Sequence, residues 1–417
     1  MAFSLHEAKP IAELCRIIDC EHKTAPYVDS SEYLVVRTSN VRDGRLVMED
    51  MKFTTHEGYQ EWTQRAVPEF GDVLFTREAP AGESCLVPQD MKVCMGQRMV
   101  LLRPNKLKVD PIYLSMVLAT ERGKADILRL SIGSTVSRIN ISDIRNIKIA
   151  ALPLVEQKKI AQILSTWDQA ISTTEQLLAN SQQQKKALMQ QLLTGRKRLL
   201  DKSGVRFSGE WKDIPLNKMA EVIVSPVDKK TEPNEIPVEL CNYTDVYYNH
   251  QITRNITFMK ATATKSEVAK YTLRQGDVII TKDSETPGDI AIPALVSEDL
   301  KGVVCGYHLA IVRPHIDCLH GAFLNYLFSM QSTRYYFFTL ATGATRFGLS
   351  VGGINRAHFR VPDVAEQQKI AAVLSTTDRE ITLLQKKLEA LKQEKKALMQ
   401  QLLTGKRRVK INEKEVA

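Results

Sequence analysis

The phrase KKALMQQLLTG stands at Lys185–Gly195 and returns letter for letter at Lys395–Gly405. The text on its N-terminal side repeats as well, because EQKKIAQILSTWDQAI (156–171) corresponds to EQQKIAAVLSTTDREI (366–381) without insertion or deletion. A period of about half of the 417-residue chain indicates two copies of one unit, each a globular head followed by a long helix. Pseudo-twofold symmetry between the two units is therefore expected.

The repeated segments carry apolar residues at alternating steps of four and three, which is the heptad pattern of a coiled coil. Two such stripes in one chain most simply bury each other, and twofold symmetry makes the two helices antiparallel. About 39 residues per helix give a length of ~58 Å. The predicted seam consists of Ile160, Leu164, Trp167, Ile171, Thr174, Leu178, Ser181, Lys185, Leu188 and Leu192, and of Ile370, Leu374, Thr377, Ile381, Leu384, Leu388, Leu391, Lys395, Leu398 and Leu402.

Glycines follow both predicted helices, and a lysine interrupts each apolar seam. Gly195 and Gly405 are expected to end the helices, since glycine adopts the left-handed conformation that follows a helix terminus. Lys185 and Lys395 occupy matching seam positions. They either fix the register of the pair at some expense in stability or pack their stems and direct their amines to water.

The heads repeat more faintly. VVRTSNVRDG (35–44) parallels ELCNYTDVYYN (239–249), GDV at 71–73 parallels GDV at 276–278, and GQRMVLLRP (96–104) parallels GYHLAIVRP (306–314). The offset is 205 positions for the first two comparisons and 210 for the third, so the second head contains five extra residues. Short β-branched runs predict strands at 34–36, 73–75, 99–102, 278–281 and 309–312, and helices are expected near 110–119 and 320–330. A mixed α/β head follows, with its topology open.

The formal net charge of +9 raises the question of nucleic-acid binding. Residues 1–155 and 201–365 each carry a net charge of zero, whereas 156–200 carry +4 and 366–417 carry +5. The excess therefore lies in the repeated helical parts, where it is either a solvated face or a contact with nucleic acid or a partner. Heads without net charge would have to place individual cations over phosphates.

Other sequence features restrict the class of protein. No apolar run has membrane-spanning length and no basic-then-apolar leader opens the chain, which predicts a cytoplasmic protein without membrane contact. The seven cysteines form no C-x-x-C pair, which is typical of free thiols in a reducing compartment. Cys15, Cys20 and His22 lack a fourth ligand nearby, so no metal site is predicted.

The chain resembles the specificity subunit of type I restriction-modification systems over nearly its whole length. The resemblance rests on the P-x(2,3)-EQ-x-KI-A-x-x-LS-T-x-D opening (153–168 and 362–378) and on the KKALMQQLLTG closing, each present twice with different heads between. It implies a target-recognition domain at 1–155, a first coiled-coil helix at 156–199, a second target-recognition domain at 200–364, and a second helix with a basic tail at 365–417.

The resemblance also implies a function. Such a subunit is not an enzyme by itself; each recognition domain reads one half of a split target in double-stranded DNA, and the coiled coil that separates the domains sets the unread gap. Because the two heads differ, the target would be asymmetric. Two methyltransferase subunits, which bind S-adenosylmethionine, would dock on the subunit, and translocating restriction subunits would join to cleave DNA. No cofactor is expected in this chain itself.

Candidate DNA contacts follow predicted strands or lie in Gly/Ser/Thr-rich loops, where amide, hydroxyl or cationic side chains could reach bases or phosphates. The alternative is a polar turn in which Asn bonds its own backbone for the first two groups, a surface charge beside a hairpin for the next two, and a plain loop for the last two. The candidates are Arg37, Thr38, Ser39, Asn40 and Arg42; Asn242, Tyr243, Thr244 and Tyr247; Thr76 and Arg77; Thr281 and Lys282; Ser134, Thr135 and Arg138; and Thr345 and Arg346.

Candidate partner contacts lie near the C-terminal ends of the helices. Cations there also favour the helix dipole, which is the structural alternative to contact with a methyltransferase surface or DNA backbone. The candidates are Lys185, Lys186, Arg196 and Arg198 in the first copy and Lys395, Lys396, Arg407 and Arg408 in the second.

Three enzyme motifs are incomplete. DPIY (110–113) has Ile112 where an amino-methyltransferase has a second proline, and Asp as N-cap with Pro at the first helical position explains it better. Asp363, Glu366 and Lys369 depart from nuclease spacing, and Gly123-Lys124 lacks the rest of a P-loop. The alternative hypothesis, a DNA-modifying enzyme with an unrecognised active site, therefore finds no motif to support it.

Overall fold

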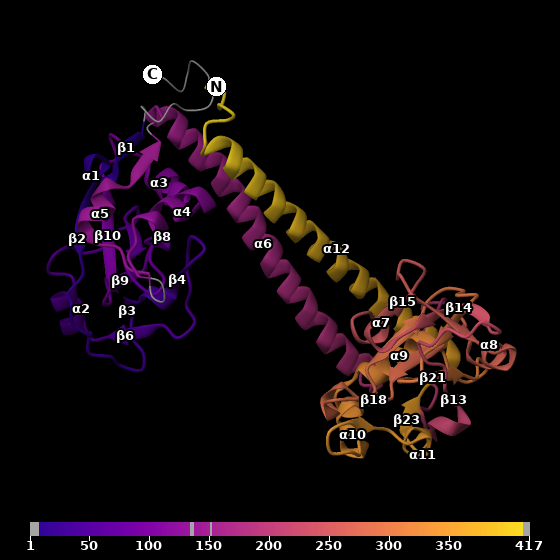
Figure 1. Ribbon diagram of the computed structural model, residues 1–417. Coiled ribbons are helices and arrows are strands. Elements are labelled where there is room, and N and C mark those ends of the chain that lie inside the picture. The colour runs from indigo at the N-terminus through magenta and orange to yellow at the C-terminus, as the bar shows by residue number, and fades with distance from the viewer. Residues whose placement is uncertain (1–7, 134–136, 151, 412–417) are drawn as a thin grey trace. The chain divides into compact units, whose positions relative to one another are not determined.

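The computed structural model describes residues 8–133, 137–150 and 152–411. It divides into two compact units, one formed by Met1–Glu175 with Lys386–Ala417 and the other by Gln176–Gln385. Each unit contains one head and a stretch of both long helices, α6 (Leu154–Leu192) and α12 (Val364–Leu402). Figure 1 labels many of the elements, α6 and α12 among them.

The first head is a mixed α/β fold, as predicted. A four-stranded antiparallel sheet has the order β2-β10-β7-β8, and a three-stranded sheet has the order β6-β3-β9 with β3 parallel to β9. The elements are β1 (Ala8–Pro10), α1 (Ile11–Leu14), β2 (Cys15–Asp19), β3 (Tyr33–Val36), η2 (Thr38–Asn40), β4 (Val41–Arg42), β5 (Arg45–Leu46), β6 (Lys52–Thr54), α2 (His56–Trp62), β7 (Val73–Thr76), β8 (Ser84–Leu86), β9 (Lys92–Met95), β10 (Met99–Pro104), α3 (Pro111–Ala119), α4 (Glu121–Arg129), α5 (Ile141–Asn146) and β11 (Lys148–Ala150).

The second head repeats this plan. Its main sheet has the order β13-β21-β17-β19-β15, and its second sheet has the order β16-β14-β20 with β14 parallel to β20. The elements are β12 (Lys212–Pro215), η3 (Leu216–Lys218), β13 (Ala220–Val224), β14 (Ile236–Cys241), α7 (Tyr243–Tyr247), β15 (Gln251–Ile252), β16 (Met259–Ala263), α8 (Lys265–Tyr271), β17 (Val278–Thr281), β18 (Asp283–Ser284), η4 (Pro287–Asp289), β19 (Pro293–Val296), β20 (Val303–Cys305), β21 (Leu309–Pro314), α9 (Gly321–Ser329), α10 (Gln331–Leu340), β22 (Phe347–Gly348), α11 (Val351–Asn355) and β23 (His358–Val361).

The central strands are buried on both faces, which explains their continuous apolar text. Val73, Leu74 and Phe75 in β7 are fully buried, as are Val278 and Ile279 in β17. Each such side chain contributes roughly 1.5–3 kcal/mol relative to an exposed position. The predicted strands and the two predicted head helices are all present, with bounds that differ by a few residues.

The coiled-coil prediction is confirmed within each unit. Every predicted seam residue is buried or half-buried, from Ile160 and Leu164 in α6 to Leu402 in α12. In the first unit Ile160 and Leu164 share a core cluster with Leu402, so the start of α6 lies beside the end of α12 and the helices are antiparallel. Beyond the last turns, Gly195 (φ +71°) and Gly405 (φ +70°) take the left-handed conformation, as the sequence predicted.

The seam lysines form ion pairs. Lys395 Nζ lies 2.6 Å from Asp168 Oδ1 in the first unit, and Lys185 Nζ lies 2.5 Å from Asp378 Oδ1 in the second. Each lysine therefore reaches a carboxylate on the facing helix, an arrangement that favours one register of the helix pair.

Candidate nucleic-acid interface

Three chain segments meet at the same place in each head, held by matching backbone hydrogen bonds. In the first head the Arg77 N–H donates to the Arg98 carbonyl (2.8 Å), and the Ile139 N–H donates to the Arg77 carbonyl (2.9 Å). In the second head Lys282 takes the place of Arg77, with His308 and Leu349 as its partners at 2.9 Å each. The end of one strand, the tip of a turn and a later loop therefore converge on one backbone frame, built twice.

A carboxylate occupies the centre of this frame in the first head. Glu78 Oε2 lies 3.1 Å from Arg98 Nε, and Glu78 Oε1 lies 3.3 Å from Arg138 Nε. The glutamate side chain is 20% exposed, whereas those of Arg98 and Arg138 are 56% and 57% exposed. Two guanidinium groups thus lie at the surface above one half-buried acid. We call Glu78, Arg98 and Arg138 the head 1 cluster.

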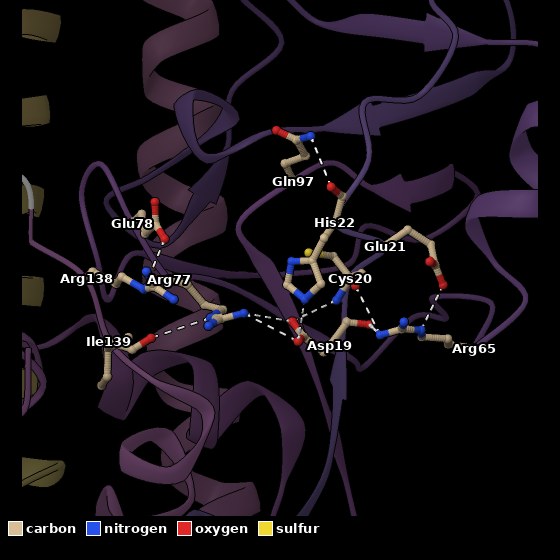
Figure 2. A network of polar contacts seen from close by, with 10 residues as sticks. All are labelled: Asp19, Cys20, Glu21, His22, Arg65, Arg77, Glu78, Gln97, Arg138 and Ile139. Atoms are coloured by element: carbon tan, nitrogen blue, oxygen red, sulfur yellow. Dashed lines mark hydrogen bonds and ion pairs between the residues drawn. The ribbon is translucent and has the colours of Figure 1, made fainter.

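Arg77 lies beneath the head 1 cluster and points away from it. Figure 2 shows its guanidinium directed at Asp19, with Nη1 3.1 Å from Asp19 Oδ1, while Nε donates to the Ile139 carbonyl at 3.5 Å. Arg77 is buried, and Asp19 also pairs with His22 at 3.0 Å. This arginine, predicted as a DNA contact, joins β2 to the loop that carries Arg138.

The second head has the same centre with different side chains. Asp283 stands where the first head has Glu78, pairs with His308, and lies 3.0 Å from Lys282 Nζ and 3.6 Å from Arg346 Nη2. The Arg346 side chain is 56% exposed and its Nη2 lies 2.8 Å from His308 Nδ1. The Tyr307 ring centroid is 3.6 Å from that of His308. We call Asp283, His308 and Arg346 the head 2 cluster.

The other predicted candidates after these strands serve the turns. Thr76 is fully buried and donates to the Pro80 carbonyl at 2.6 Å, and Thr281 likewise donates to the Asp289 carbonyl at 2.6 Å. Their hydroxyls are committed inside the head, so neither can face DNA in this conformation. Ser134 and Thr135 lie outside the described residues. Thr345 is exposed beside Arg346.

The earlier loop of the first head is largely a polar turn, the alternative that the sequence left open. Asn40 is fully buried, and its Nδ2 donates to the carbonyls of Val47 (3.1 Å) and Glu49 (3.0 Å). Arg37 Nη2 donates to the Asp50 carbonyl at 2.5 Å. Thr38 is half-buried, and Ser39 and Arg42 are exposed.

The matching loop of the second head is engaged in the same manner. The Asn242 Nδ2 donates to the Leu240 carbonyl at 3.4 Å. The Tyr243 hydroxyl lies 3.1 Å from Ser284 Oγ, and the Tyr247 hydroxyl donates to Asp289 Oδ1 at 3.2 Å. The two tyrosine rings stack with centroids 5.5 Å apart, while Thr244 is exposed. The loop is therefore held by side-chain contacts, and its tyrosines are half-buried rather than free.

The glutamate of each EQ phrase pairs with an arginine of the basic segment that follows the other long helix. Glu366 is fully buried and receives Arg198 through two hydrogen bonds of 2.6 Å each. Glu156 in the first unit receives Arg408 in the same manner, with Nε 2.7 Å from Oε2. Arg198 and Arg408, predicted to contact a partner, are thus paired within the chain, each with the glutamate of an EQ phrase.

The glutamines of the EQ phrase close a second repeated contact. Gln367 is fully buried; its Nε2 donates to the carbonyls of Cys318 and Pro362 at 2.9 Å each, and its Oε1 accepts from the His320 N–H at 2.8 Å. Gln157 accepts from the Asp110 N–H at 2.8 Å in the matching place. Gln157 thus holds the loop that leads into α3, and Gln367 holds the loop that leads into α9.

The remaining candidate partner residues divide into two groups. Lys185 and Lys395 form the seam ion pairs, and Lys396 Nζ lies 2.8 Å from Glu121 Oε1. Lys186, Arg196 and Arg407 are exposed. The last three present cations at the helix ends.

A groove that the sequence did not indicate lies within the first unit, between the head and the helices. It has a volume of about 900 Å³. Arg45 spans it, with Nη2 3.5 Å from Asp168 and Nη1 3.6 Å from Glu175, and Lys392 Nζ lies 2.8 Å from Glu175. Six of its lining side chains are basic and three are acidic: Arg42, Arg45, Arg122, Lys392, Lys395 and Lys396 against Asp43, Glu121 and Glu175.

Sequence reasoning missed both central acids, although one signal was present. The strings GDVLFTRE (71–78) and GDVIITKD (276–283) align without a gap and end on an acid in both heads.

Across the described ranges no three His, Cys, Asp or Glu side chains are grouped in a way that could hold a metal. None of the described helices is both long and apolar enough to cross a membrane.

Comparison with known proteins connects this architecture to one family. The family model described as type I restriction modification DNA specificity domain matches residues 6–180 and again residues 208–393. The putative type I restriction enzyme MjaX specificity subunit of Methanocaldococcus jannaschii is 25% identical over 406 residues, covering 92% of this chain and 89% of that protein. The StySPI specificity subunit of Salmonella potsdam is 22% identical over 354 residues, covering 82% and 75%.

Solved structures show the same fold. The type I restriction-modification S subunit from M. genitalium superimposes with a TM-score of 0.56 at 13% identity, covering 97% of this chain and 96% of that one. A chain from a structure of type I R-M complex assembly and conformational transition gives a TM-score of 0.52 at 17% identity, with coverage of 95% and 97%. Because the family model matches both heads and most of both long helices, this chain belongs to the type I restriction modification DNA specificity family.

Proposed function

We propose that this chain, as the specificity subunit of a type I restriction-modification system, reads a split target in double-stranded DNA with one half-site per head. The observation that carries the proposal is the frame built twice from matching backbone hydrogen bonds, around Arg77 in one head and Lys282 in the other. A constant frame that presents different side chains suits two reading surfaces with different half-sites, hence an asymmetric target.

The paired helices would set the unread gap between the half-sites. Each helix has 39 residues, which corresponds to ~58 Å or at most about 17 base pairs of duplex. Ion pairs at Lys395–Asp168 and Lys185–Asp378 favour a single register, so the spacing would be fixed.

Two methyltransferase subunits, binding S-adenosylmethionine, and restriction subunits complete the proposed complex, which would act in the cytoplasm. The twofold repeat supports two copies of one partner, because an exposed arginine follows each long helix, Arg196 in one unit and Arg407 in the other. Exposed cations at Lys186, Arg196 and Arg407 are the proposed partner contacts. Modification chemistry would belong to the partners, since the matched family is a DNA specificity domain.

Co-expression of the chain with its methyltransferase partner, followed by genome-wide methylation mapping, tests the proposal. We expect methylation at one asymmetric, split motif, and no methyl transfer from S-adenosylmethionine by the purified chain alone. A continuous motif, or activity without the partner, would overturn it. An unrelated specificity subunit expressed with the same partner serves as the control for motif assignment.

A further inference from the structure

The two clusters share a frame and differ in what they present. Glu78 and Asp283 occupy the same place after a repeated strand, two positions beyond Thr76 and Thr281. The turn tip supplies Arg98 in the first head and His308 in the second, through the same backbone hydrogen bond. The supporting backbone and the acid are thus kept, while the side chains around the acid differ between the heads.

The order of burial within each cluster separates support from surface. Glu78, Asp283 and His308 are 20%, 16% and 21% exposed, whereas Arg98, Arg138 and Arg346 are all 56–57% exposed. A carboxylate that engages a guanidinium from below fixes its direction without covering its outer N–H groups. Donors whose direction is fixed by a second residue lose less conformational freedom when they bind.

The acid also argues against a purely electrostatic phosphate contact. A phosphate placed over either cluster would approach a carboxylate of the same sign, which weakens the attraction that the arginines provide. Base edges carry no net charge, and the guanidinium fork matches the O6 and N7 acceptors of guanine. An acid-supported arginine is therefore better suited to a base edge than to a phosphate.

The backbone at the tip of the first cluster is unusual. Arg98 has φ +67°, a left-handed conformation that costs a non-glycine residue free energy. Its carbonyl accepts the Arg77 N–H, which holds the tip in place. Gln97 and Arg98 are thereby projected from the turn on a fixed backbone.

We propose that Arg98 and Arg138 in the head 1 cluster, and Arg346 in the head 2 cluster, contact base edges and determine letters of the two half-sites. Glu78, Asp283 and the half-buried His308, whose ring nitrogens lie 2.8 Å and 3.0 Å from Arg346 Nη2, are positioning residues that orient these donors. The inference rests on the proposed function, because it assigns residues to half-sites that the proposed function requires. It adds the acids and the two turn-tip residues to the candidates drawn from the sequence.

The test uses the full chain in complex with its methyltransferase partner and duplexes based on the wild-type motif. Each duplex changes one base pair of one half-site, and methylation rates give a discrimination ratio for every position. We expect Arg98→Ala and Arg138→Ala to lower discrimination about ten- to hundredfold at positions of one half-site only. His308→Ala and Arg346→Ala should do the same at the other half-site only.

Matched controls are Arg16→Ala in the first head and Arg360→Ala in the second, which are exposed arginines outside both clusters. They should leave every ratio unchanged. A misfolded head would abolish methylation, whereas the proposal requires that methylation continues and that discrimination between base pairs decreases. Unchanged discrimination ratios in all four cluster variants would overturn the assignment of these residues. The proposed function would still stand in that case, because it depends on the split motif that the wild-type chain methylates.

The positioning role has its own readout. Glu78→Gln should lower discrimination at the first half-site without weakening overall DNA binding, because the variant removes a negative charge. Glu78→Asp should retain most of the discrimination, since aspartate occupies this place in the second head. If Glu78→Gln keeps full discrimination, the carboxylate does not orient the arginines and this part of the proposal fails.

Discussion

Arg198 and Glu366 form a two-pronged ion pair across 168 positions of sequence, with both guanidinium–carboxylate distances at 2.6 Å. The glutamate is fully buried, so its charge depends on this arginine. The same relationship joins Arg408 to Glu156 in the other unit. The pair connects the tail of one long helix to the first turn of the other in each unit.

Removal of Arg198 should destabilise the second unit. Arg198→Ala leaves a buried carboxylate without its counter-ion, at an expected loss of about 3 kcal/mol in the free energy of unfolding. Trp211 lies 5.9 Å from the Arg198 guanidinium, so its fluorescence during urea denaturation reports the change locally. The neighbouring exposed Arg196→Ala should shift the transition by less than about 0.5 kcal/mol. Equal effects of the two variants would contradict the importance of the ion pair.

Gln367→Glu should be more harmful than its small size suggests. The amide donates to the Cys318 and Pro362 carbonyls, and a carboxylate there would face both oxygens with no proton to offer. We expect a loss of roughly 2–3 kcal/mol. Hydrogen exchange at the loop before α9 is the measurement, and Gln368→Glu, at an exposed position, is the control. Exchange that stays slow in Gln367→Glu would show that the clamp is dispensable.

His320 predicts a pH dependence of the second unit. Burial lowers the pKa of this imidazole below 6.5 in the folded protein. As the pH falls below 6.5 the unfolded chain takes up a proton that the folded chain resists, so stability present above pH 6.5 is progressively lost. Urea midpoints measured between pH 7.5 and 5 should therefore decrease in wild type. His320→Asn should flatten that part of the profile.

The same substitution should also add a helix cap. In the first head Asp110 Oδ1 accepts the Tyr113 N–H at the start of α3, whereas His320 at the matching place caps α9 with no side-chain hydrogen bond. Asn at this position supplies the missing acceptor and should stabilise by about 1 kcal/mol at pH 7.5. A less stable variant at that pH would mean that the imidazole packs better than an amide can.

Insertion of one heptad tests the spacer. The ion pairs Lys185–Asp378 and Lys395–Asp168 bracket the stretches around Gln176 in α6 and Lys386 in α12. Seven residues added to both helices there should keep both pairs and lengthen the spacer by ~10 Å, or about 3 base pairs. Methylation mapping should show the same half-site letters with a wider gap.

The matched control for this experiment is the same heptad in one helix only. It cannot keep both ion pairs in register and should lower stability and methylation together. Altered letters in the double insertion would mean that the helices themselves read bases.

The repeated text predicted the helices and strands because period and propensity are local properties. The seam from Ile160 to Leu192, the capping role of Asp110 and the left-handed Gly195 all follow from short stretches of sequence. Short stretches of sequence do not show which polar side chains face outward. Arg77 is buried because Asp19, 58 positions earlier, lies beside it, and Asn40 is buried because the Val47 and Glu49 carbonyls need a donor.

The two clusters also depend on contacts between residues that are far apart in the sequence. Glu78 meets Arg98 and Arg138 only through the folded frame, at separations of 20 and 60 positions that carry no periodic signal. The aligned strings 71–78 and 276–283 marked the acids, but nothing in either string indicated their partners.

The division of the chain into units also affects the order in which they can form during synthesis. The second unit is one uninterrupted stretch, Gln176–Gln385, whereas the first needs Lys386–Ala417, which is synthesised after the whole of the second unit. Ile160 and Leu164 therefore remain without Leu402 until the second unit has been made. The head made first is completed after the second one, and until then its unpaired apolar helix face is a site at which the nascent chain can aggregate.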